Sequence, residues 1–306
     1  MIGKILAILQ KLFDLFMLLH ELYNQARSIH RRLRRAVKER LKPEVHQKRV
    51  RAFIKSKHSS SQITIFPTAK PSVAIIVPCY GHAPFLEEMF ESIKNQTQAA
   101  DQAIFVIDHS PDASAKILER LIQEYQDHTK TELILLHNEK NIGQAASLNK
   151  GIEFSSCDLI MILNDDDYLM HDCIETAVQL LGKYPQAALL GGHSLHFSSE
   201  QLASTPKIIQ AIRPLDQIEI DFRPPEKALQ YRKYNDINMT HSGSCFYKSA
   251  WQAIGGYYPD KSERLVHFSD RDFQLRMNAI FPVILSNITP LSCWRNDSSV
   301  DQGVNS

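Results

Sequence analysis

Short apolar runs alternate along residues 72–192 with segments whose apolar side chains recur every three to four positions. The runs are typical of buried strands, and the longer segments are typical of amphipathic helices. The expected strands are residues 73–77, 103–107, 132–137, 158–163 and 187–192. The expected helices begin near Pro84, cover residues 117–125 and 144–154, and follow again from residue 174 to 181. This alternation predicts an α/β fold, with a mostly parallel sheet covered by helices on both faces.

Polar residues follow the ends of these expected strands. In an open parallel sheet, ligands bind beyond the carboxyl ends of the strands. The residues at those ends are Cys79, Tyr80, Asp108, Asn138 and Asn164 to Asp167. Their convergence on one edge of the sheet predicts a binding site there.

Three of these residues, Asp165, Asp166 and Asp167, are consecutive carboxylates directly after an apolar strand. Adjacent carboxylates repel one another unless a cation neutralises them. Oxygen ligands suit Mg²⁺ or Mn²⁺, and such an ion often completes its coordination with substrate phosphates. The alternative interpretation is an acidic turn in solvent. Together with the other strand-end residues, the pattern favours a divalent cation and a diphosphate ligand.

The first 57 residues have a different character. Apolar residues follow heptad spacing from Ile5 to Val37, but charged residues interrupt them, so no run reaches the roughly 20 apolar residues of a spanning helix. Residues 27–57 carry 13 Lys and Arg against two Glu, a net charge of +11. Two interpretations stay open. One is an amphipathic helix and basic neck on an anionic membrane surface. The other is a coiled coil that forms an oligomer, or a helix docked on the body.

A polar, serine-rich stretch at residues 55–62, followed by Pro67 and Pro71, suggests a boundary. We therefore expect a helix and basic neck over 1–57, a linker over 58–71 and the α/β domain over 72–306. The five cysteines are widely spread, with no CxxC pair and no zinc spacing. This favours a reducing compartment, and hence a cytoplasmic protein that is peripheral on the inner face of a membrane.

Five motifs, in order and at fitting distances, resemble the family-2 glycosyltransferases, which have the Rossmann-like GT-A fold. The opening strand and helix, "VAIIVPCYGHAPFLEEMFESIKNQT", resemble the family's V-P-x-Y-N and S-x-x-x-Q-T. "VIDHSPDAS" resembles V-D-D-G-S-T-D-G-S, and "NEKNIGQAASLNKGI" resembles N-x-G-x-x-x-A-x-N-x-G. "LNDDDYL" resembles L-D-x-D-D-x-L. "SGSCFYKSAWQAIGGYYP" and "FSDRDFQLRM" resemble the acceptor-side block that ends in E-D-x-D-L-x-x-R. The resemblance covers residues 72 to about 280.

The resemblance implies roles for individual residues. A nucleotide-sugar donor would contact Pro78, Cys79, Tyr80, Asp108, Asn149, Lys150, Asn164 and Asp165. In the L-D-x-D-D register, Asp166 is the ligand of a Mg²⁺ or Mn²⁺ ion. A register shifted by one residue would make Asp167 the ligand instead. Trp294 and Arg295 resemble an aromatic–Arg pair that covers the phosphates in the family.

The resemblance also implies an inverting reaction. An acceptor hydroxyl, on a saccharide or a lipid-linked saccharide, would attack the anomeric carbon from the face opposite the diphosphate. Asp270 would take its proton as general base, and the metal would stabilise the leaving diphosphate. Asp272 would be a neighbouring carboxylate that could instead brace the helix. The implied setting is cell-surface polysaccharide synthesis.

Three positions depart from the family pattern: Ile107, Asn164 and Ser269 stand where the family has acidic residues. They leave open a catalytically inactive, family-shaped binding or scaffold protein. A nucleic-acid binder that uses the basic neck is a further alternative. We do not expect it, because the neck lacks interleaved aromatic residues apart from Phe53.

Overall fold

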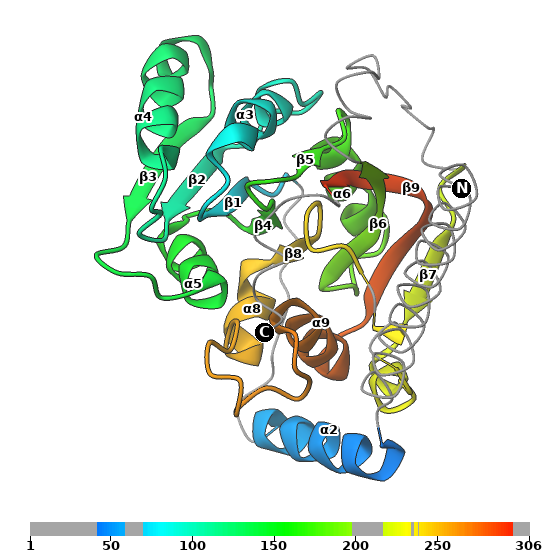
Figure 1. The fold of residues 1–306 in the computed structure, drawn as a ribbon. Coiled ribbons are helices and arrows are strands. Elements are labelled where there is room, and N and C mark those ends of the chain that lie inside the picture. The colour runs from blue at the N-terminus through cyan, green and yellow to red at the C-terminus, as the bar shows by residue number, and fades with distance from the viewer. Residues whose placement is uncertain (1–41, 59–69, 198–216, 234–235, 238, 296–306) are drawn as a thin grey trace, which may run out of the picture.

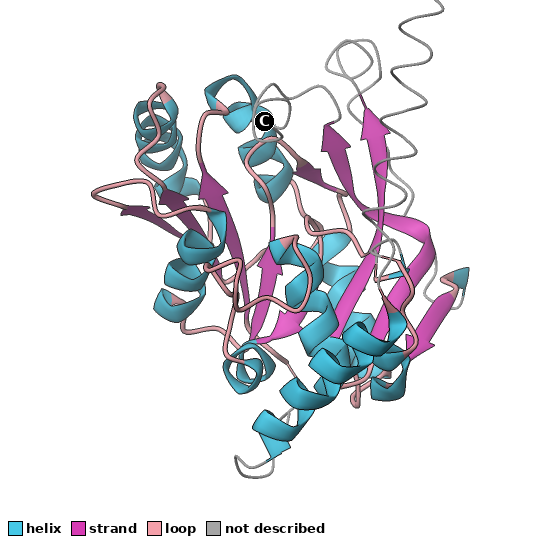
Figure 2. Ribbon diagram, turned by 60° about the horizontal axis from the view of Figure 1, so that its bottom comes forward, coloured by secondary structure: helices cyan, strands magenta, loops and turns pink. Residues whose placement is uncertain are grey.

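The computed structural model describes residues 42–58, 70–197, 217–233, 236–237 and 239–295. Within these ranges the chain forms one nine-stranded sheet with helices on both faces (Figures 1 and 2). The strands are β1 (Val73–Cys79), β2 (Gln102–Ile107), β3 (Glu132–His137), β4 (Leu159–Ile162), β5 (Tyr168–Leu169), β6 (Leu189–Phe197), β7 (Ile220–Arg223), β8 (Cys245–Tyr247) and β9 (Val283–Arg295). The helices are α2 (Pro43–His58), α3 (Leu86–Lys94), α4 (Ser114–Tyr125), α5 (Gln144–Phe154), α6 (Cys173–Lys183), α8 (Lys248–Ile254) and α9 (Ser269–Ile280). Short 3₁₀ turns are η1 (Ala83–Phe85), η2 (Gln126–His128) and η4 (Pro225–Leu229).

The sheet confirms the predicted α/β class. Its strand order is β3-β2-β1-β4-β8-β6-β9-β5, with β7 paired to β9. Strands β3, β2, β1 and β4 are parallel, and β8 is inserted antiparallel between β4 and β6. All five predicted strands are present, and the helix predicted over 144–154 coincides with α5.

Opposite faces of β2 carry different helices. Phe105 stacks on Phe90 of α3 at 5.7 Å between ring centroids, and Phe90 also meets Tyr125 of α4. The neighbouring side chains Ile104 and Val106 point the other way, because side chains alternate along a strand, and they meet α5. Helices α3 and α4 therefore lie on one face and α5 on the other, as Figure 1 shows.

This arrangement creates a switch point between β1 and β4. The chain leaves β1 through α3 on one face, and it enters β4 from α5 on the opposite face. The loops that follow these two adjacent strands diverge, and the resulting crevice is where open α/β sheets bind ligands. The loop after β1 begins at Tyr80, and the loop after β4 contains Asp165 and Asp166.

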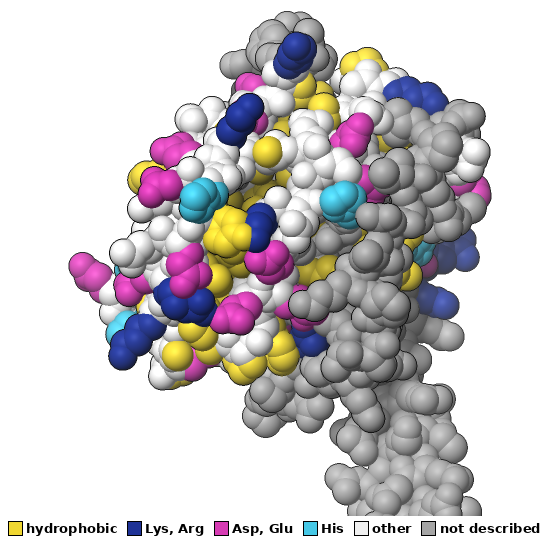
Figure 3. Space-filling view, turned by 90° about the horizontal axis from the view of Figure 1, so that it is seen from above, with side chains coloured by type: hydrophobic (Ala, Val, Ile, Leu, Met, Phe, Trp, Pro, Cys, Tyr) yellow, Lys and Arg dark blue, Asp and Glu magenta, His cyan; other side chains and the backbone are white. Residues whose placement is uncertain are grey.

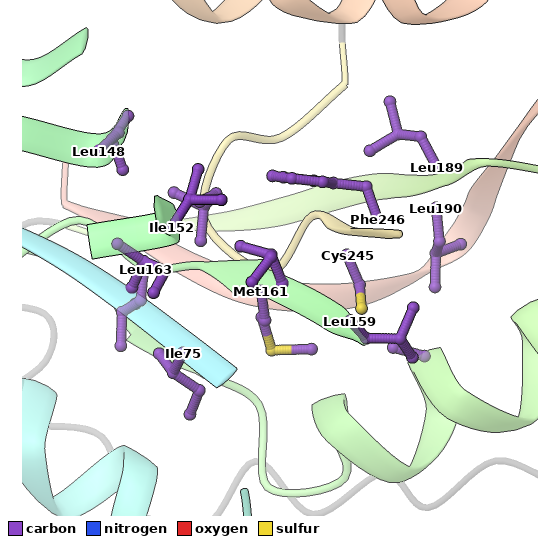
Figure 4. Packing of buried hydrophobic residues seen from close by; sticks show 14 of the residues in the cluster. Ile75, Leu148, Ile152, Leu159, Met161, Leu163, Leu189, Leu190, Cys245 and Phe246 are labelled. Atoms are coloured by element: carbon purple, nitrogen blue, oxygen red, sulfur yellow. The ribbon is translucent and has the colours of Figure 1, made fainter. Parts of the chain in front are cut away.

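The core under this crevice is apolar and closely packed. Leu148 and Ile152 of α5 lie over one face of β4, as Figure 4 shows. On the other side, Met161 reaches Cys173 of α6, with 3.7 Å between the two sulfurs. Gly151 allows α5 to lie directly on the sheet, because a Cβ there would stand 2.7 Å from the Ile76 side chain. The strand ends are thus held on a rigid base.

Helix α2 packs on the body rather than extending from it. Val50 and Phe53 are buried, and His46 bonds the Ala228 carbonyl of η4 at 2.8 Å. The residues of α2 were expected to belong to a separate neck, and the structure brings them against α9 and η4. The amphipathic segment predicted before α2 falls in residues 1–41, outside the described residues. Among the described helices, none is both long and apolar enough to cross a bilayer.

A buried ion pair holds α9 to its surroundings. Arg276 and Asp272, one turn apart on α9, are both fully buried and bond at 2.8 Å. Arg276 also donates to the carbonyls of Ile254 and Gly256, at 3.2 and 2.7 Å. Its guanidinium lies 3.7 Å from the Tyr258 ring centroid. The second oxygen of Asp272 accepts the backbone N–H of Leu265 at 2.6 Å. One charge pair thereby links α9, α8 and the loop between them.

We predict that Asp272→Asn lowers the free energy of unfolding by about 3–5 kcal/mol, because it leaves the Arg276 charge buried without its counter-ion. Urea unfolding measures the change. Glu87→Gln is the matched control, since it removes the solvent-exposed Arg120–Glu87 pair and should leave stability nearly unchanged. Equal effects in the two variants would contradict the structural role of Asp272.

Candidate active site

Two carboxylates from the loop after β4 meet a histidine from the loop after β1. His82 Nδ1 lies 2.7 Å from Asp165 Oδ1, and His82 Nε2 lies 3.9 Å from Asp166 Oδ2. The other oxygen of Asp165 accepts the Tyr80 N–H at 2.8 Å. Burial raises the pKa of Asp165, against the lowering effect of His82. Among the described residues, His82, Asp165 and Asp166 offer three ligand atoms within 4.8 Å of one another, which could hold a metal ion.

Asp167 points into the protein instead. One of its oxygens accepts the Arg295 N–H at 3.1 Å. The other accepts the Ser242 hydroxyl at 2.5 Å and the Asn164 amide at 3.2 Å. Burial and the charge of Asp166 together raise the pKa of Asp167 to about 7. With both oxygens taken by the chain, Asp167 anchors the loop. This geometry favours the register in which Asp166 faces the ligand.

Asn164 connects the β4 loop to α5. Its side-chain oxygen accepts the Gln144 amide at 3.0 Å, and its backbone N–H donates to Ser242 at 3.1 Å. The side chain is half-buried at the strand end. An asparagine here keeps hydrogen-bonding capacity but adds no charge to the three carboxylates that follow.

Asp108, at the end of β2, is buried and organises a loop. Its two oxygens accept the Asn138 amide at 2.9 Å and the backbone N–H groups of Ile142 and Gly143, both at 2.8 Å. The contact of Asp108 with a nucleotide-sugar donor stays a prediction. Asp108 instead shapes the turn that leads into α5.

The next residue, His109, has an unusual backbone. Its φ is +55°, a left-handed conformation that a non-glycine residue adopts rarely. The family motif has glycine at this place. The loops after β1 and β2 are joined nearby, because the Ser110 hydroxyl accepts the Gly81 N–H and Asp112 accepts the Ala83 N–H. His109 is exposed beside these joined loops.

Asn149 and Lys150, both expected near the nucleotide, are engaged elsewhere. Asn149 bonds both the N–H and the carbonyl of Tyr257, at 2.9 and 2.8 Å. Lys150 donates to the carbonyl of His137 and to the Asn138 side chain, both at 2.7 Å. Each residue holds a neighbouring loop: Asn149 the one after α8, and Lys150 the one after β3.

The first predicted binding loop turns mostly inward. Pro78 and Cys79 are buried in β1, and burial raises the pKa of the Cys79 thiol well above its ordinary value. Tyr80 is 39% exposed and follows directly. Of these three residues, only Tyr80 presents its side chain to the surface.

Asp270 lies in the first turn of α9, near His241 and Tyr257. His241 Nε2 is 3.1 Å from the Tyr257 hydroxyl, and the Tyr257 ring stacks on Phe273 at 4.1 Å. Burial lowers the pKa of His241, while the charge of Asp270 raises it. His241 precedes Ser242, which bonds Asp167. Two adjacent residues therefore connect the aspartate loop to the neighbourhood of Asp270.

Arg295 closes the other side of the aspartate loop. It donates to the Asp166 carbonyl at 3.0 Å, pairs with Glu88 and lies 4.1 Å from the Phe85 ring centroid. Together with Trp294, it lines a small hollow beside Asp166 and Tyr168.

His82 and Ser242 were not predicted as site residues from the sequence. His82 could be recognised only by knowing that β1 and β4 are neighbours, and Ser242 only from the insertion of β8.

Comparisons with known proteins identify the family and the fold. The family model described as "Glycosyl transferase family 2" matches residues 74–252. An uncharacterized glycosyltransferase of Methanocaldococcus jannaschii is 35% identical over 107 residues, which are 35% of this chain and 36% of the relative. A processive diacylglycerol beta-glycosyltransferase of Mycoplasma pneumoniae is 28% identical over 110 residues, 36% of this chain and 31% of the relative. The matches thus span about a third of these relatives.

Solved structures show the same fold. TarS of S. aureus (residues 1–349), solved in complex with UDP-GlcNAc, superposes with a TM-score of 0.56 at 12% identity, over 74% of this chain and 59% of that one. At this identity the likeness concerns the fold alone. The family model covers more than half of the chain, in the region that holds the switch point and the aspartate loop. This chain belongs to glycosyl transferase family 2.

Proposed function

We propose that this chain is an inverting, metal-dependent glycosyltransferase. It moves a sugar from a nucleotide-diphosphate sugar to an acceptor hydroxyl on a glycan or lipid-linked saccharide, in cell-surface polysaccharide synthesis. The observation that carries this proposal is the link through His241 and Ser242, which connects the aspartate loop with the neighbourhood of Asp270. A metal-binding carboxylate and a base carboxylate in one continuous site are what this reaction needs.

On the donor side, the exposed Tyr80 and the half-buried Asn164 contact the nucleotide. The other residues expected there, including Asp108 and Lys150, shape the loops around it. This division is supported by their hydrogen bonds, since the carboxylate of Asp108 and the ammonium of Lys150 both bond to the chain.

The residues of the aspartate loop are suitable ligands for a divalent cation. Asp166 offers carboxylate oxygen, the ligand that Mg²⁺ and Mn²⁺ prefer, and buried Asp165 and Asp167 on either side add negative charge. When bound, such an ion supplies positive charge that stabilises a leaving diphosphate. The chain's own residues hold the loop in place, through Ser242 and the backbone of Arg295.

On the acceptor side, Asp270 accepts the proton of the attacking hydroxyl. As that proton moves to the carboxylate, the hydroxyl oxygen bonds the anomeric carbon and the bond from that carbon to the diphosphate oxygen breaks. The product sugar is inverted. His241 and Tyr257 lie near this carboxylate, and Asn149 fixes Tyr257 by its backbone.

The membrane association is also a proposal. Helix α2 exposes Lys48, Arg49, Arg51 and Lys55, which continue the basic stretch that begins at residue 27. On the face seen in Figure 3, by contrast, acidic and basic side chains are interspersed. A predominantly basic surface is suited to anionic lipids. The helix before it would either lie in the membrane or pair with a second copy.

We predict that Asp270→Asn slows sugar transfer by about 10²- to 10⁴-fold and leaves nucleotide-sugar binding near normal, because it removes the general base alone. Transfer is assayed with a panel of nucleotide sugars and Mn²⁺, and binding by calorimetry. Glu263→Gln, an exposed carboxylate in the preceding loop, is the control. Unchanged transfer, or loss of donor binding, would show that the role is misassigned. Absence of any turnover by the wild type would favour the binding or scaffold protein.

Asp167 gives stability a pH dependence. Its folded pKa is about 7 and its ordinary value is 3.8, so between these pH values the folded state holds a proton that the unfolded chain releases. Stability should therefore fall as pH rises through this window. In EDTA, we expect the free energy of unfolding to fall between pH 5 and pH 8 by about 2–3 kcal/mol less in Asp167→Asn than in the wild type. Parallel pH profiles from urea unfolding would contradict this.

We predict that removing residues 1–41 releases the protein from anionic vesicles without unfolding it. This truncation retains α2, whose Val50 and Phe53 are buried on the body. Vesicle co-sedimentation and the cooperativity of unfolding are the measurements. Neutral vesicles serve as the control. A wild type that never binds would argue against the membrane proposal. A truncated protein that stays bound would show that α2 and the body bind the membrane without residues 1–41. A change in oligomeric state alone would support the coiled coil.

A further inference from the structure

His82 stands between two carboxylates that differ in their other contacts. Each oxygen of Asp165 has a partner from the loop after β1: one lies 2.7 Å from the His82 ring nitrogen Nδ1, and the other accepts the Tyr80 N–H at 2.8 Å. Asp166 faces the opposite ring nitrogen, with 3.9 Å between Nε2 and Oδ2. The imidazole is therefore fixed from behind by Asp165 and directed toward Asp166.

This arrangement determines the tautomer of a neutral His82. A carboxylate can only accept, so Nδ1 carries the hydrogen, and Nε2 presents a lone pair. That lone pair faces a carboxylate oxygen, and two electron-rich atoms at this distance attract a cation. Neighbouring ligands of one octahedral ion at about 2.1 Å lie roughly 3 Å apart. The two atoms are 3.9 Å apart, so a shift of about 1 Å would bring both onto one ion.

We propose that His82 Nε2 is a ligand of the divalent ion, together with Asp166, and that Asp165 orients the histidine. This deepens the proposed function and rests on it. The three consecutive aspartates then have three tasks: Asp165 holds the histidine, Asp166 binds the ion and Asp167 anchors the loop. A carboxylate behind a metal-bound histidine fixes its tautomer and increases its basicity, and losing such a partner costs 10- to 100-fold in metal affinity.

The proposal makes a specific statement about which ion binds. Mg²⁺ prefers oxygen ligands, whereas an imidazole nitrogen favours transition metals, with an affinity that rises from Mn²⁺ to Co²⁺. The site should therefore prefer Mn²⁺ and Co²⁺ to Mg²⁺, and this preference should depend on His82. The competing account is that His82 is doubly protonated and itself neutralises the two aspartates, in which case a metal would compete with it.

The test compares wild type, His82→Gln, Asp165→Asn and Asp166→Asn, with His128→Gln as a matched control in an exposed position. Circular dichroism confirms folding. Binding of Mn²⁺, Co²⁺ and Mg²⁺ is measured by calorimetry, with UDP and separately with GDP present. Pulsed electron paramagnetic resonance of bound Mn²⁺ detects the nuclear coupling of a directly bonded imidazole nitrogen.

We expect the wild type to show the nitrogen coupling and His82→Gln to lose it. His82→Gln should bind Mn²⁺ and Co²⁺ at least tenfold more weakly, with a smaller loss for Mg²⁺. Asp165→Asn should weaken Mn²⁺ binding by about 10- to 100-fold. His128→Gln should match the wild type.

The proposal would be overturned if the wild type showed no nitrogen coupling, or if His82→Gln bound Mn²⁺ with unchanged affinity. In either case, metal-dependent sugar transfer by the wild type would still support the proposed function. Tighter metal binding by His82→Gln would overturn the proposal in favour of the protonated histidine. Conversely, loss of the nitrogen coupling in His82→Gln would support His82 as a metal ligand. If the wild type then turned over no nucleotide sugar, the proposed function would be refuted.

Discussion

The burial of three consecutive carboxylates at the switch point between β1 and β4 is the constraint on which the site depends. Each carboxylate must find compensation, because an unpaired buried charge is costly. Asp167 finds it in Ser242, Asn164 and the Arg295 backbone. Asp165 finds it in the loop after β1. These bonds draw together β1, β4, β9 and the segment before β8, so neutralising the aspartates also assembles the site.

A second buried charge pair likewise holds together the elements around α9. Arg276 is satisfied by Asp272 and by carbonyls near the end of α8, and it stacks on Tyr258. Asn149, from α5, reaches the same loop and fixes Tyr257. The donor half of the sheet and the acceptor-side helices are therefore not independent units. A change in one helix can displace Asp270, the proposed base, through this loop.

The sequence was sufficient for the parts of the fold that depend on local pattern. Apolar runs and helical stripes identified β1 to β4 and α3 to α6, and the position of the aspartates followed from them. The pattern could not divide the tasks among Asp165, Asp166 and Asp167, because that division depends on which strands are neighbours. It likewise gave no sign that Asn149 bonds Tyr257, or that His82 meets Asp165. The basic composition of residues 43–58 also gave no sign that α2 packs on α9 and η4.

Because α2 is docked on the body, its length fixes where the chain before it joins the body. A helix of 16 residues is about 24 Å long, at 1.5 Å per residue. Its buried side chains, Val50 and Phe53, fasten it to the body near α9, which carries Asp270 in its first turn. The start of α2 at Pro43 is therefore a fixed point on the body. If the proposed membrane contact acts through this point, it would set how the proposed base is oriented toward a surface, and so which hydroxyls on that surface come within its reach.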